Sequence, residues 1–365
     1  MLHWPAQIRV IVLACIFAVA SIVVSSTAAV SGDVSNKRPQ ASAQALWVTN
    51  LGMFSDLQGR GLTHSGVAHP KLVFGNPADY AGGLAFKGDD ELWGAVMGDP
   101  SLRGTSFIFQ LTTAQLRKLA KHERVKPAIE MDNAGGAALH FDSAGNLWVA
   151  TPPSDIPDLV MYSPDQLVSG TAPPPARTIT FVDSIGNITD FAFDSSGNLW
   201  VDTDYSSNGE EQAALSELTP DQFAASGSSI MPHLQLPGAA GKALAFDSSG
   251  DLWAATEAAI YMYPPTELTG TGVQSVTPAI TIRSVPVGRG ASFGDPDGLA
   301  FDAQGNLWVA SSSDVGGINF GGIAEYTADE ITSSGSPQPK VVLWANRRQT
   351  NLGSPSLITF GPQLK

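Results

Sequence analysis

Five segments of the chain repeat the same alternation of apolar and polar residues, and each predicts an antiparallel β-hairpin. In the last copy, Leu299-Ala300-Phe301 is the first strand and Leu307-Trp308-Val309-Ala310 starts the second. In every copy the Phe precedes the Trp by seven residues, and successive Trp residues are 55, 52, 53 and 55 positions apart. A period of two indicates half-buried strands, and a repeat of ~50 residues is typical of propeller blades.

The residues between the paired strands predict a tight turn. Four of the five copies have Asp directly after the Phe and Gly three residues later, at Asp142, Asp194, Asp247 and Asp302. An Asp side chain can accept hydrogen bonds from turn N–H groups, and Gly tolerates a positive φ. The spacing resembles a calcium loop, but the later ligands of such a loop are absent. We therefore interpret these Asp residues as turn formers.

A short helical turn is predicted after the third strand of each unit. Ser163 to Gln166, Thr219 to Gln222 and Thr327 to Glu330 each place Ser or Thr three residues before Gln or Glu. That spacing is a capping box, and the Pro in two of the copies suits the first helical position. Thr112 to Gln115 is a weaker copy. A fourth strand follows, for example at residues 177–181, and we interpret the helical turns as scaffold.

The two ends of the chain complete the count of blades. Leu357 to Phe360 matches the first strand of the repeat, but the chain stops before the following Trp. Leu46 to Thr49 matches the second strand, but no Phe strand precedes it. Pairing the two would close a ring and remove an open sheet edge. The sequence therefore predicts an all-β, six-bladed β-propeller with four-stranded blades over residues 45–365, closed by its N- and C-terminal strands.

The first 30 residues predict a secretory signal peptide. Arg9 is followed by an apolar run from Val10 to Val24 and then by small residues. The run is shorter than the ~20 residues of a membrane span. We expect cleavage, a secreted or periplasmic protein and no stable membrane span afterwards; the alternative is tethering by an uncleaved signal anchor. Residues 31–44 predict a flexible linker. Cys15, the only cysteine, lies in the apolar run, so the mature chain would have no disulfide.

Composition and charge narrow the set of partners. The chain is 43% hydrophobic and 15% charged, which favours a packed core over disorder. Its formal charge is −14, with 20 basic and 34 acidic residues. Such a surface repels the phosphate backbone, so nucleic acid is not an expected partner. A small molecule, a glycan or a protein remains as the expected partner.

The run from Asp297 to Ala310 resembles the gluconolactonase/regucalcin-like propellers, and it is similar to NHL-repeat propellers and streptogramin lyase. The resemblance covers residues 45–362. In the lactonase-like family it implies a divalent metal held by Glu, Asn and Asp at the starts of inner strands, and Asp297-Gly298-Leu299 matches the Asp motif. The equivalent positions, which include Gly82, Ala137, Thr189 and Lys242, hold neither Glu nor Asn. The metal triad is therefore not reproduced position by position; the alternative is that loop shifts bring Asp132, Asn133, Asn187 or Asp190 inward.

The resemblance to streptogramin lyase implies histidines near the channel. The histidines of this chain do not fall in matching repeats. His140 stands where other copies have Ala, and we expect it to pack between blades.

Candidate site residues come from one face of the predicted ring, where first strands start and second strands end. These positions are mostly acidic or amide residues, namely Asp132, Asn133, Asn187, Asp190, Asp295 and Asp297 before first strands and Asp99, Asp155, Asp202, Asp204, Glu257 and Asp314 after second strands. Asp202 replaces the Ala of other blades, and Lys242 aligns with Asp297. We predict ligand binding by Asn133, Asn187, Asp190, Asp202, Asp204 and Lys242.

Two functions remain open at this stage. The first is an exported, non-catalytic propeller that binds its partner on the acidic face. The second is a metal-dependent, lactonase-like hydrolase or lyase, with Asp297 as base or metal ligand and a divalent cation, Ca²⁺ or Mg²⁺, as cofactor. Carboxylate and amide oxygens suit such cations. The incomplete triad favours binding.

Overall fold

The computed structural model describes most of the chain after residue 43, namely residues 44–50, 53–75, 80–88, 90–98, 106–151, 158–181, 187–207, 210–239, 241–284, 286–287, 290–291, 293–312, 321–344 and 355–363. The predicted signal peptide lies outside these residues, as does the predicted linker up to residue 43. Gln44 already belongs to the first strand. Within the described part, no helix has the length and apolar character needed to cross a membrane.

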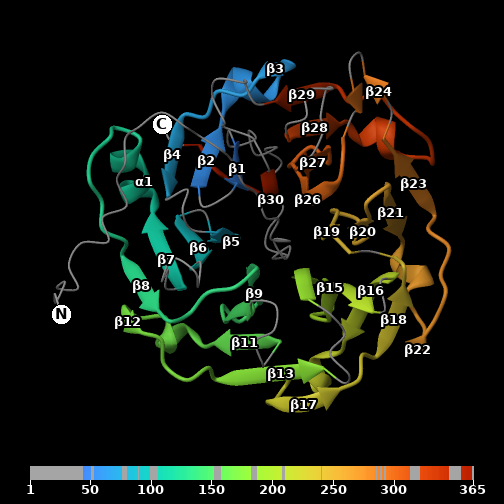
Figure 1. Ribbon diagram of the computed structural model, residues 1–365, viewed down its shortest axis with the longest axis horizontal. Coiled ribbons are helices and arrows are strands. Elements are labelled where there is room, and N and C mark those ends of the chain that lie inside the picture. The colour runs from blue at the N-terminus through green and yellow to red at the C-terminus, as the bar shows by residue number, and fades with distance from the viewer. Residues whose placement is uncertain are drawn as a thin grey trace, which may run out of the picture.

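The described strands form a ring of six sheets around a central axis, which confirms the predicted six-bladed propeller (Figure 1). Within a blade, four strands run antiparallel from the centre outwards. Blade 1 consists of β30 (Pro355–Pro362), β1 (Gln44–Asn50), β2 (Met53–Leu57) and β4 (Leu72–Gly75). Blade 2 consists of β5 (Tyr80–Lys87), β6 (Glu91–Met97), β7 (Phe107–Thr112) and β8 (Ile129–Asp132).

The other four blades follow in chain order. Blade 3 consists of β9 (Ala138–Phe141), β10 (Leu147–Ala150), β11 (Leu159–Tyr162) and β13 (Arg177–Phe181). Blade 4 consists of β14 (Asn187–Phe193), β15 (Leu199–Ser207), β16 (Glu210–Leu218) and β18 (Leu234–Pro237). Blade 5 consists of β19 (Ala243–Phe246), β20 (Leu252–Ala255), β21 (Ala259–Tyr263) and β23 (Ile280–Arg283). Blade 6 consists of β26 (Pro296–Phe301), β27 (Leu307–Ser311), β28 (Gly322–Tyr326) and β29 (Val341–Trp344). A small hairpin, β24 (Pro286–Val287) with β25 (Gly290–Ala291), precedes blade 6.

Four blades carry a fifth strand that the sequence did not predict. Each added strand lies parallel to the outermost strand of one blade but belongs to the chain segment of the next blade. These strands are β3 (Gly66–Val67), β12 (Gly170–Thr171), β17 (Gly227–Ile230) and β22 (Gly272–Val273). A single bridge between Ile282 and Gly335 does the same for blade 5. The outer edges, which would otherwise expose unpaired N–H and C=O groups, are thereby covered.

The predicted helical turns all form where the third strands end. They are α1 (Thr113–Leu119), η3 (Pro164–Gln166), η4 (Pro220–Gln222), η5 (Pro265–Glu267) and η6 (Ala328–Ile331), with η1 (Gly59–Leu62) in blade 1. Four of them have the expected capping box, at Thr112, Ser163, Thr219 and Thr327. The chain that leaves η1, η3, η4, η5 and η6 pairs with the outermost strand of the preceding blade, whereas α1 is followed by β8 of its own blade.

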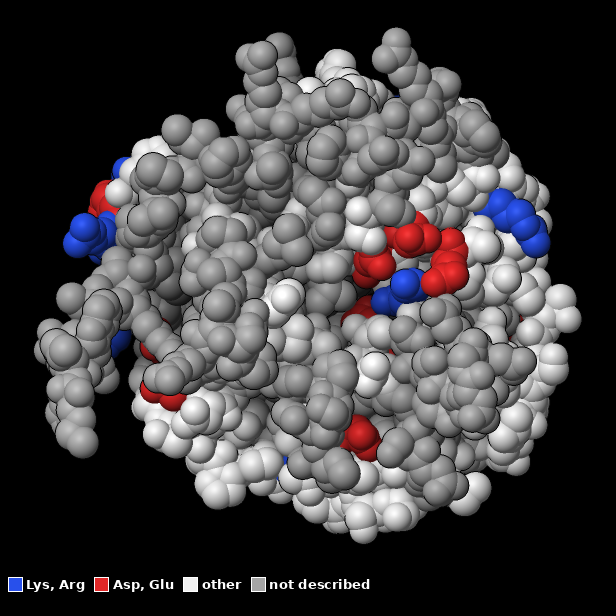
Figure 2. All heavy atoms as spheres, in the orientation of Figure 1, with Lys and Arg blue, Asp and Glu red and all other residues white. Residues whose placement is uncertain are grey.

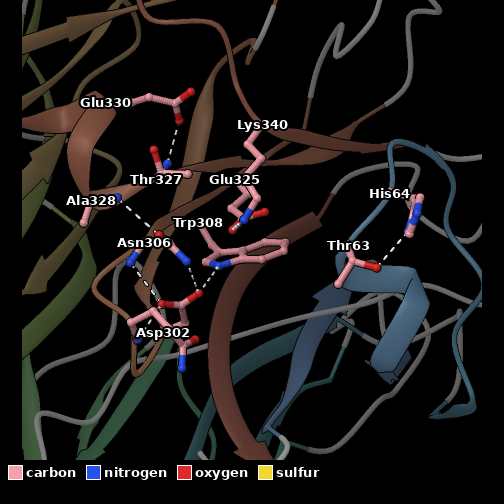
Figure 3. Close-up of polar contacts among 11 residues, drawn as sticks. Thr63, His64, Asp302, Asn306, Trp308, Glu325, Thr327, Ala328, Glu330 and Lys340 are labelled. Atoms are coloured by element: carbon pink, nitrogen blue, oxygen red, sulfur yellow. Dashed lines mark hydrogen bonds and ion pairs between the residues drawn. The ribbon is translucent and has the colours of Figure 1, made fainter.

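The turn aspartates hold the hairpins as predicted. In blade 6, Asp302 Oδ1 accepts the backbone N–H groups of Gln304 and Asn306, each at 2.9 Å. Its Oδ2 accepts the Asn306 side-chain amide at 2.8 Å and the Trp308 indole N–H at 3.1 Å (Figure 3). Gly305 has a φ of +80°. Asp142, Asp194 and Asp247 bind Trp148, Trp200 and Trp253 in the same way.

The split blade closes the ring. β1 pairs antiparallel with β30, with Leu46 opposite Phe360 and Val48 opposite Ile358. In Figure 1 the two ends of the colour scale, blue β1 and red β30, lie side by side. The Phe and Trp of the split hairpin also pack as their equivalents do elsewhere. Phe360 meets Trp308 of blade 6 edge-to-face at 6.0 Å, and Trp47 meets Phe86 of blade 2 edge-to-face at 5.7 Å.

We predict that Asp302→Ala lowers the free energy of unfolding by about 2–4 kcal/mol, because two backbone N–H groups and a buried indole lose their acceptor. Urea denaturation followed by Trp fluorescence measures this. Asp221→Ala, at an exposed position in η4, is the matched control and should change stability by no more than about 0.5 kcal/mol. Equal effects of the two substitutions would contradict the assigned role.

Candidate functional site

One edge of the ring gathers the starts of the inner strands and the ends of the second strands. Because these strands are antiparallel, Asn187 pairs with Asp204, Ala243 with Ala255 and Pro296 with Ser311. Figure 2 shows acidic side chains gathered around a basic one on this face, beside the centre of the ring and over β19, β20 and β26. This is where the sequence placed its candidate residues.

Four charged residues from two adjacent blades form what we call the rim cluster: Lys242, Glu257, Asp295 and Asp297. Lys242 precedes β19 and Glu257 follows β20, and their Nζ and Oε1 atoms are 4.0 Å apart. The Lys242 side chain is 28% exposed and that of Glu257 is 63% exposed. Lys242 also acts electrostatically on Asp297 in β26, as does Asp295. The cluster thus has one half-buried cation among three carboxylates.

Asp297 is held in place by the end of the neighbouring strand. Its Oδ2 accepts the backbone N–H of Ser312 at 2.9 Å. Burial raises the pKa of Asp297, the hydrogen bonds of Ser312 and the charge of Lys242 oppose the rise, and Asp295 adds to it. Gly298, the next residue, is needed for a different reason, because a Cβ at this position would lie 2.3 Å from the carbonyl oxygen of Ser356 in β30. Gly298 therefore permits close packing of two inner strands.

Asp190 links three consecutive blades below the rim. The residue is buried in β14, and its Oδ1 lies 3.4 Å from His140 Nε2 in β9. The same oxygen accepts the Phe191 N–H at 2.9 Å, and Oδ2 accepts the Leu244 N–H of β19 at 3.2 Å. The His140 ring packs edge-to-face on Phe191 at 4.8 Å. His140 therefore packs between blades, as the sequence indicated.

Asp202 also binds the start of β19, one contact closer to the rim cluster than Asp190. It is fully buried in β15, directly across from Asp190, and its Oδ2 accepts the Lys242 N–H at 3.1 Å. Two carboxylates of blade 4 therefore hold the start of β19 in blade 5. This contact gives Asp202 a local purpose that the Ala of other blades cannot serve. It also fixes the backbone from which the Lys242 side chain projects into the rim cluster.

Asn133, Asn187 and Asp204 come from other parts of the chain than the rim cluster, which belongs to blades 5 and 6. Asn133 is exposed, with a φ of +58°, on the connection from the outer strand β8. Asn187 is exposed at the start of β14. Asp204 pairs with it through the backbone, and the side chain of Asp204 lies outside the described part of the structure. Three further candidates, Asp99, Asp155 and Asp314, also lie outside it.

The described residues around Asp297 do not fit a divalent-cation centre. Asp190, Asp202 and Asp297 already accept backbone N–H groups, and the Lys242 ammonium competes for the Asp297 charge. Among the described residues, no three carboxylate, histidine or cysteine side chains converge as metal ligands. A cation site of the type expected for lactonase-like propellers needs three or more converging oxygen ligands.

Three buried carboxyl groups were missed by the sequence reasoning: Asp56, Glu217 and Glu325. Each lies across from the repeat Trp on the third strand, in blades 1, 4 and 6. A signal for them exists in the sequence. Each directly precedes the Leu or Tyr that ends the third strand, where the other blades have Gln110, Met161 and Met262.

Comparison with known proteins gives likeness at the level of fold. No protein-family model matches the chain, and no curated protein matches its sequence. A solved protein of unknown function from Bacteroides caccae has 11% identity and a TM-score of 0.47 over 88% of this chain and 100% of its own. A candidate gluconolactonase has 13% identity and a TM-score of 0.37 over 85% and 93%. PorZ, a surface component of the type-IX secretion system of Porphyromonas gingivalis, has 15% identity and a TM-score of 0.36 over 76% and 35%.

We predict that Asp190→Ala lowers the free energy of unfolding by about 2–4 kcal/mol, because the Leu244 N–H and buried His140 lose their acceptor. Thermal and urea denaturation would show it. Asn187→Ala, an exposed change at the start of the same strand, should stay within about 0.5 kcal/mol. If Asp190→Ala were as stable as the parent protein, Asp190 would not hold the blades together.

Proposed function

We propose that this protein is an exported β-propeller that binds a small, neutral, hydroxyl-rich molecule or the end of a glycan at the rim cluster. The observation that carries this proposal is the half-buried Lys242, which lies among Glu257, Asp295 and Asp297 beside the ring axis. The ammonium group donates hydrogen bonds and the carboxylates accept them. A ligand with several hydroxyl groups can do both with one face.

The charge of the site argues against an anionic ligand. The rim cluster holds three carboxylates and one ammonium group, and the whole chain carries a formal charge of −14. An anion would gain one attraction and meet three repulsions at short range. A protein partner is a weaker fit than a small ligand, since the cluster comes from the inner edge of only two blades.

We favour binding over metal-dependent hydrolysis for a chemical reason. A hydrolase of that type needs a cation to polarise the carbonyl oxygen of its substrate. The Lys242 ammonium stands next to the one carboxylate, Asp297, that matches the family motif. Asp297 keeps a raised pKa through burial, a property that binding residues share with catalytic bases.

Export supports the same function. The apolar run from Val10 to Val24 is the length of a signal sequence and is followed by small residues. We propose a secreted or periplasmic location, where free sugars and glycans are accessible. Mass spectrometry of the native N-terminus would distinguish a cleaved signal peptide from a retained anchor that tethers the protein to a membrane.

A glycan array containing neutral sugars and sugar acids tests the binding proposal. We expect neutral sugars to bind better than sugar acids. Lys242→Met should weaken binding by about tenfold, which corresponds to about 1.4 kcal/mol, because one donor at the centre of the cluster is lost. Asp297→Asn should reduce the discrimination against sugar acids, because it removes one negative charge.

Matched controls keep the result specific to the rim. Lys121→Met and Asp221→Asn make the same chemical changes at exposed positions on other elements. Neither should alter binding. Binding that is unaffected by Lys242→Met, or the absence of any bound sugar on the array, would refute the proposal.

A further inference from the structure

Three buried carboxyl groups occupy one position of the repeat, away from the rim cluster. Asp56, Glu217 and Glu325 are 0%, 6% and 2% exposed, respectively. Each lies opposite the repeat Trp, at Trp47, Trp200 and Trp308. Taking a carboxylate out of water is costly unless donors or a cation replace the water. The surroundings of each group therefore decide whether it is charged.

Asp56 lies wholly inside blade 1, the blade that both chain ends build. Its Oδ1 accepts the Leu72 N–H at 2.6 Å, and its Oδ2 accepts the side-chain amide of Gln58. The positive charge of Lys71 lowers the pKa of Asp56. Despite these contacts, burial raises the pKa of Asp56 to about 6. On the next blade, β5 and α1 pack on the hydrophobic core that they share with β1 and β2. Their charged residues are Lys87, Arg117 and Lys118.

Glu325 has one satisfied and one unsatisfied oxygen. Its Oε1 lies 2.9 Å from Lys340 Nζ, whose side chain is half exposed, while Oε2 is buried without a hydrogen-bond partner among the described residues (Figure 3). Burial raises the pKa of Glu325, Lys340 lowers it, and Asp302 and Glu330 raise it further. On the next blade, η1 packs on the same hydrophobic core through Leu62, and His64 follows it two residues later.

Glu217 occupies the same position of the repeat in blade 4. Burial raises its pKa, the charge of His233 lowers it and that of Asp194, the turn aspartate of its own blade, raises it. The next blade contributes Tyr261 and Tyr263 to the adjoining core cluster, with Leu268 beside η5, whose acidic residue is Glu267. In blades 4 and 6, a third-strand glutamate and a turn aspartate therefore lie close to the same Trp.

We propose that these three carboxyl groups take up protons when the ring folds at mildly acidic pH, so that the propeller is most stable in acidic surroundings. The proposal concerns the scaffold and is independent of the ligand at the rim. A protonated carboxyl can donate to a neighbouring oxygen and no longer carries a buried charge. One of the three groups, Asp56, lies in blade 1, where the two chain ends close the ring without a covalent link.

The direction of the pH effect follows from proton binding. A carboxyl group with a raised pKa in the folded state binds more protons there than in the unfolded chain, over the range between the two pKa values. For Asp56 this range extends from its ordinary value of 3.8 to about 6. Stability therefore falls as pH rises through that range and stays lower above it. The folding equilibrium constant should fall by about 100-fold from Asp56 alone.

The experiment follows the melting temperature of the mature protein from about pH 7.5 to about pH 4.5, at low salt and at about 0.5 M NaCl. We expect it to rise toward acidic pH in both. The overall negative charge also favours lower pH by reducing repulsion, but that surface effect is screened by salt, whereas titration of buried groups is not.

Neutral variants identify the groups. Asp56→Asn, Glu217→Gln and Glu325→Gln should each flatten the pH dependence, and together they should remove most of what persists at high salt. Asp221→Asn, the exposed control, should leave the dependence unchanged. Proton release on urea unfolding of the unmodified protein at about pH 5, measured with an indicator dye, tests the same claim if Asp56→Asn does not fold.

A melting temperature that stays flat or falls between neutral and mildly acidic pH at high salt would overturn the proposal. So would the absence of proton release on unfolding at about pH 5, whatever the variants do.

Discussion

The pairing of β1 with β30 is the interaction on which the rest of the structure depends. Each of the other blades is built from consecutive strands, but blade 1 joins residues more than 300 positions apart, such as Leu46 and Phe360. The chain has a single cysteine, so no intrachain disulfide can lock this contact. Backbone hydrogen bonds between β1 and β30 join the ends instead, and the joined blade packs on its neighbours through the Trp308–Phe360 and Trp47–Phe86 contacts. Without that contact, the inner strands of blades 6 and 2 would each lose a neighbour.

Polar contacts between blades then set the geometry of the rim. Asp190 and Asp202 extend from blade 4 to the N–H groups of Leu244 and Lys242, and they fix where β19 begins. Lys242 is thereby held near Glu257 and Asp297. Buried carboxylates that accept backbone N–H groups rigidify a scaffold, and a rigid scaffold is what makes loop residues effective in binding. Among the side chains that the structure describes, Asp190 and Asp202 therefore build the rim, whereas Asn133 and Asn187 face solvent.

The fold could be predicted because its determinants are local and repeated. The Phe-to-Trp spacing, the turn aspartates and the capping boxes each act within a few residues, and the spacing recurs in five continuous copies. The fifth strands could not be predicted, since their hydrogen bonds go to the preceding blade and short segments such as Gly66–Val67 or Gly170–Thr171 carry no periodicity.

The candidate site was predicted less fully for the same reason. The acidic face and the positions of Asp202 and Asp297 on it were visible in the repeat alignment. The hydrogen bonds of Asp190 to blades 3 and 5 depend on contacts 50 and 54 residues away, which no local pattern encodes.

Blade 1 also departs from the repeat: Gly361 replaces the turn aspartate, and a Cβ there would lie 2.3 Å from the ring of Phe86. Trp47 Nε1 consequently has no hydrogen-bond partner among the described residues.

Ring closure by the two chain ends is the central claim, and native-state hydrogen exchange tests it most directly. The account predicts that amides of β1 and β30, such as those of Val48 and Ile358, exchange as slowly as amides of the continuous hairpin β19–β20 in blade 5. Rapid exchange of β1 and β30 beside a protected blade 5 would mean that the ends are not joined, and it would contradict the account.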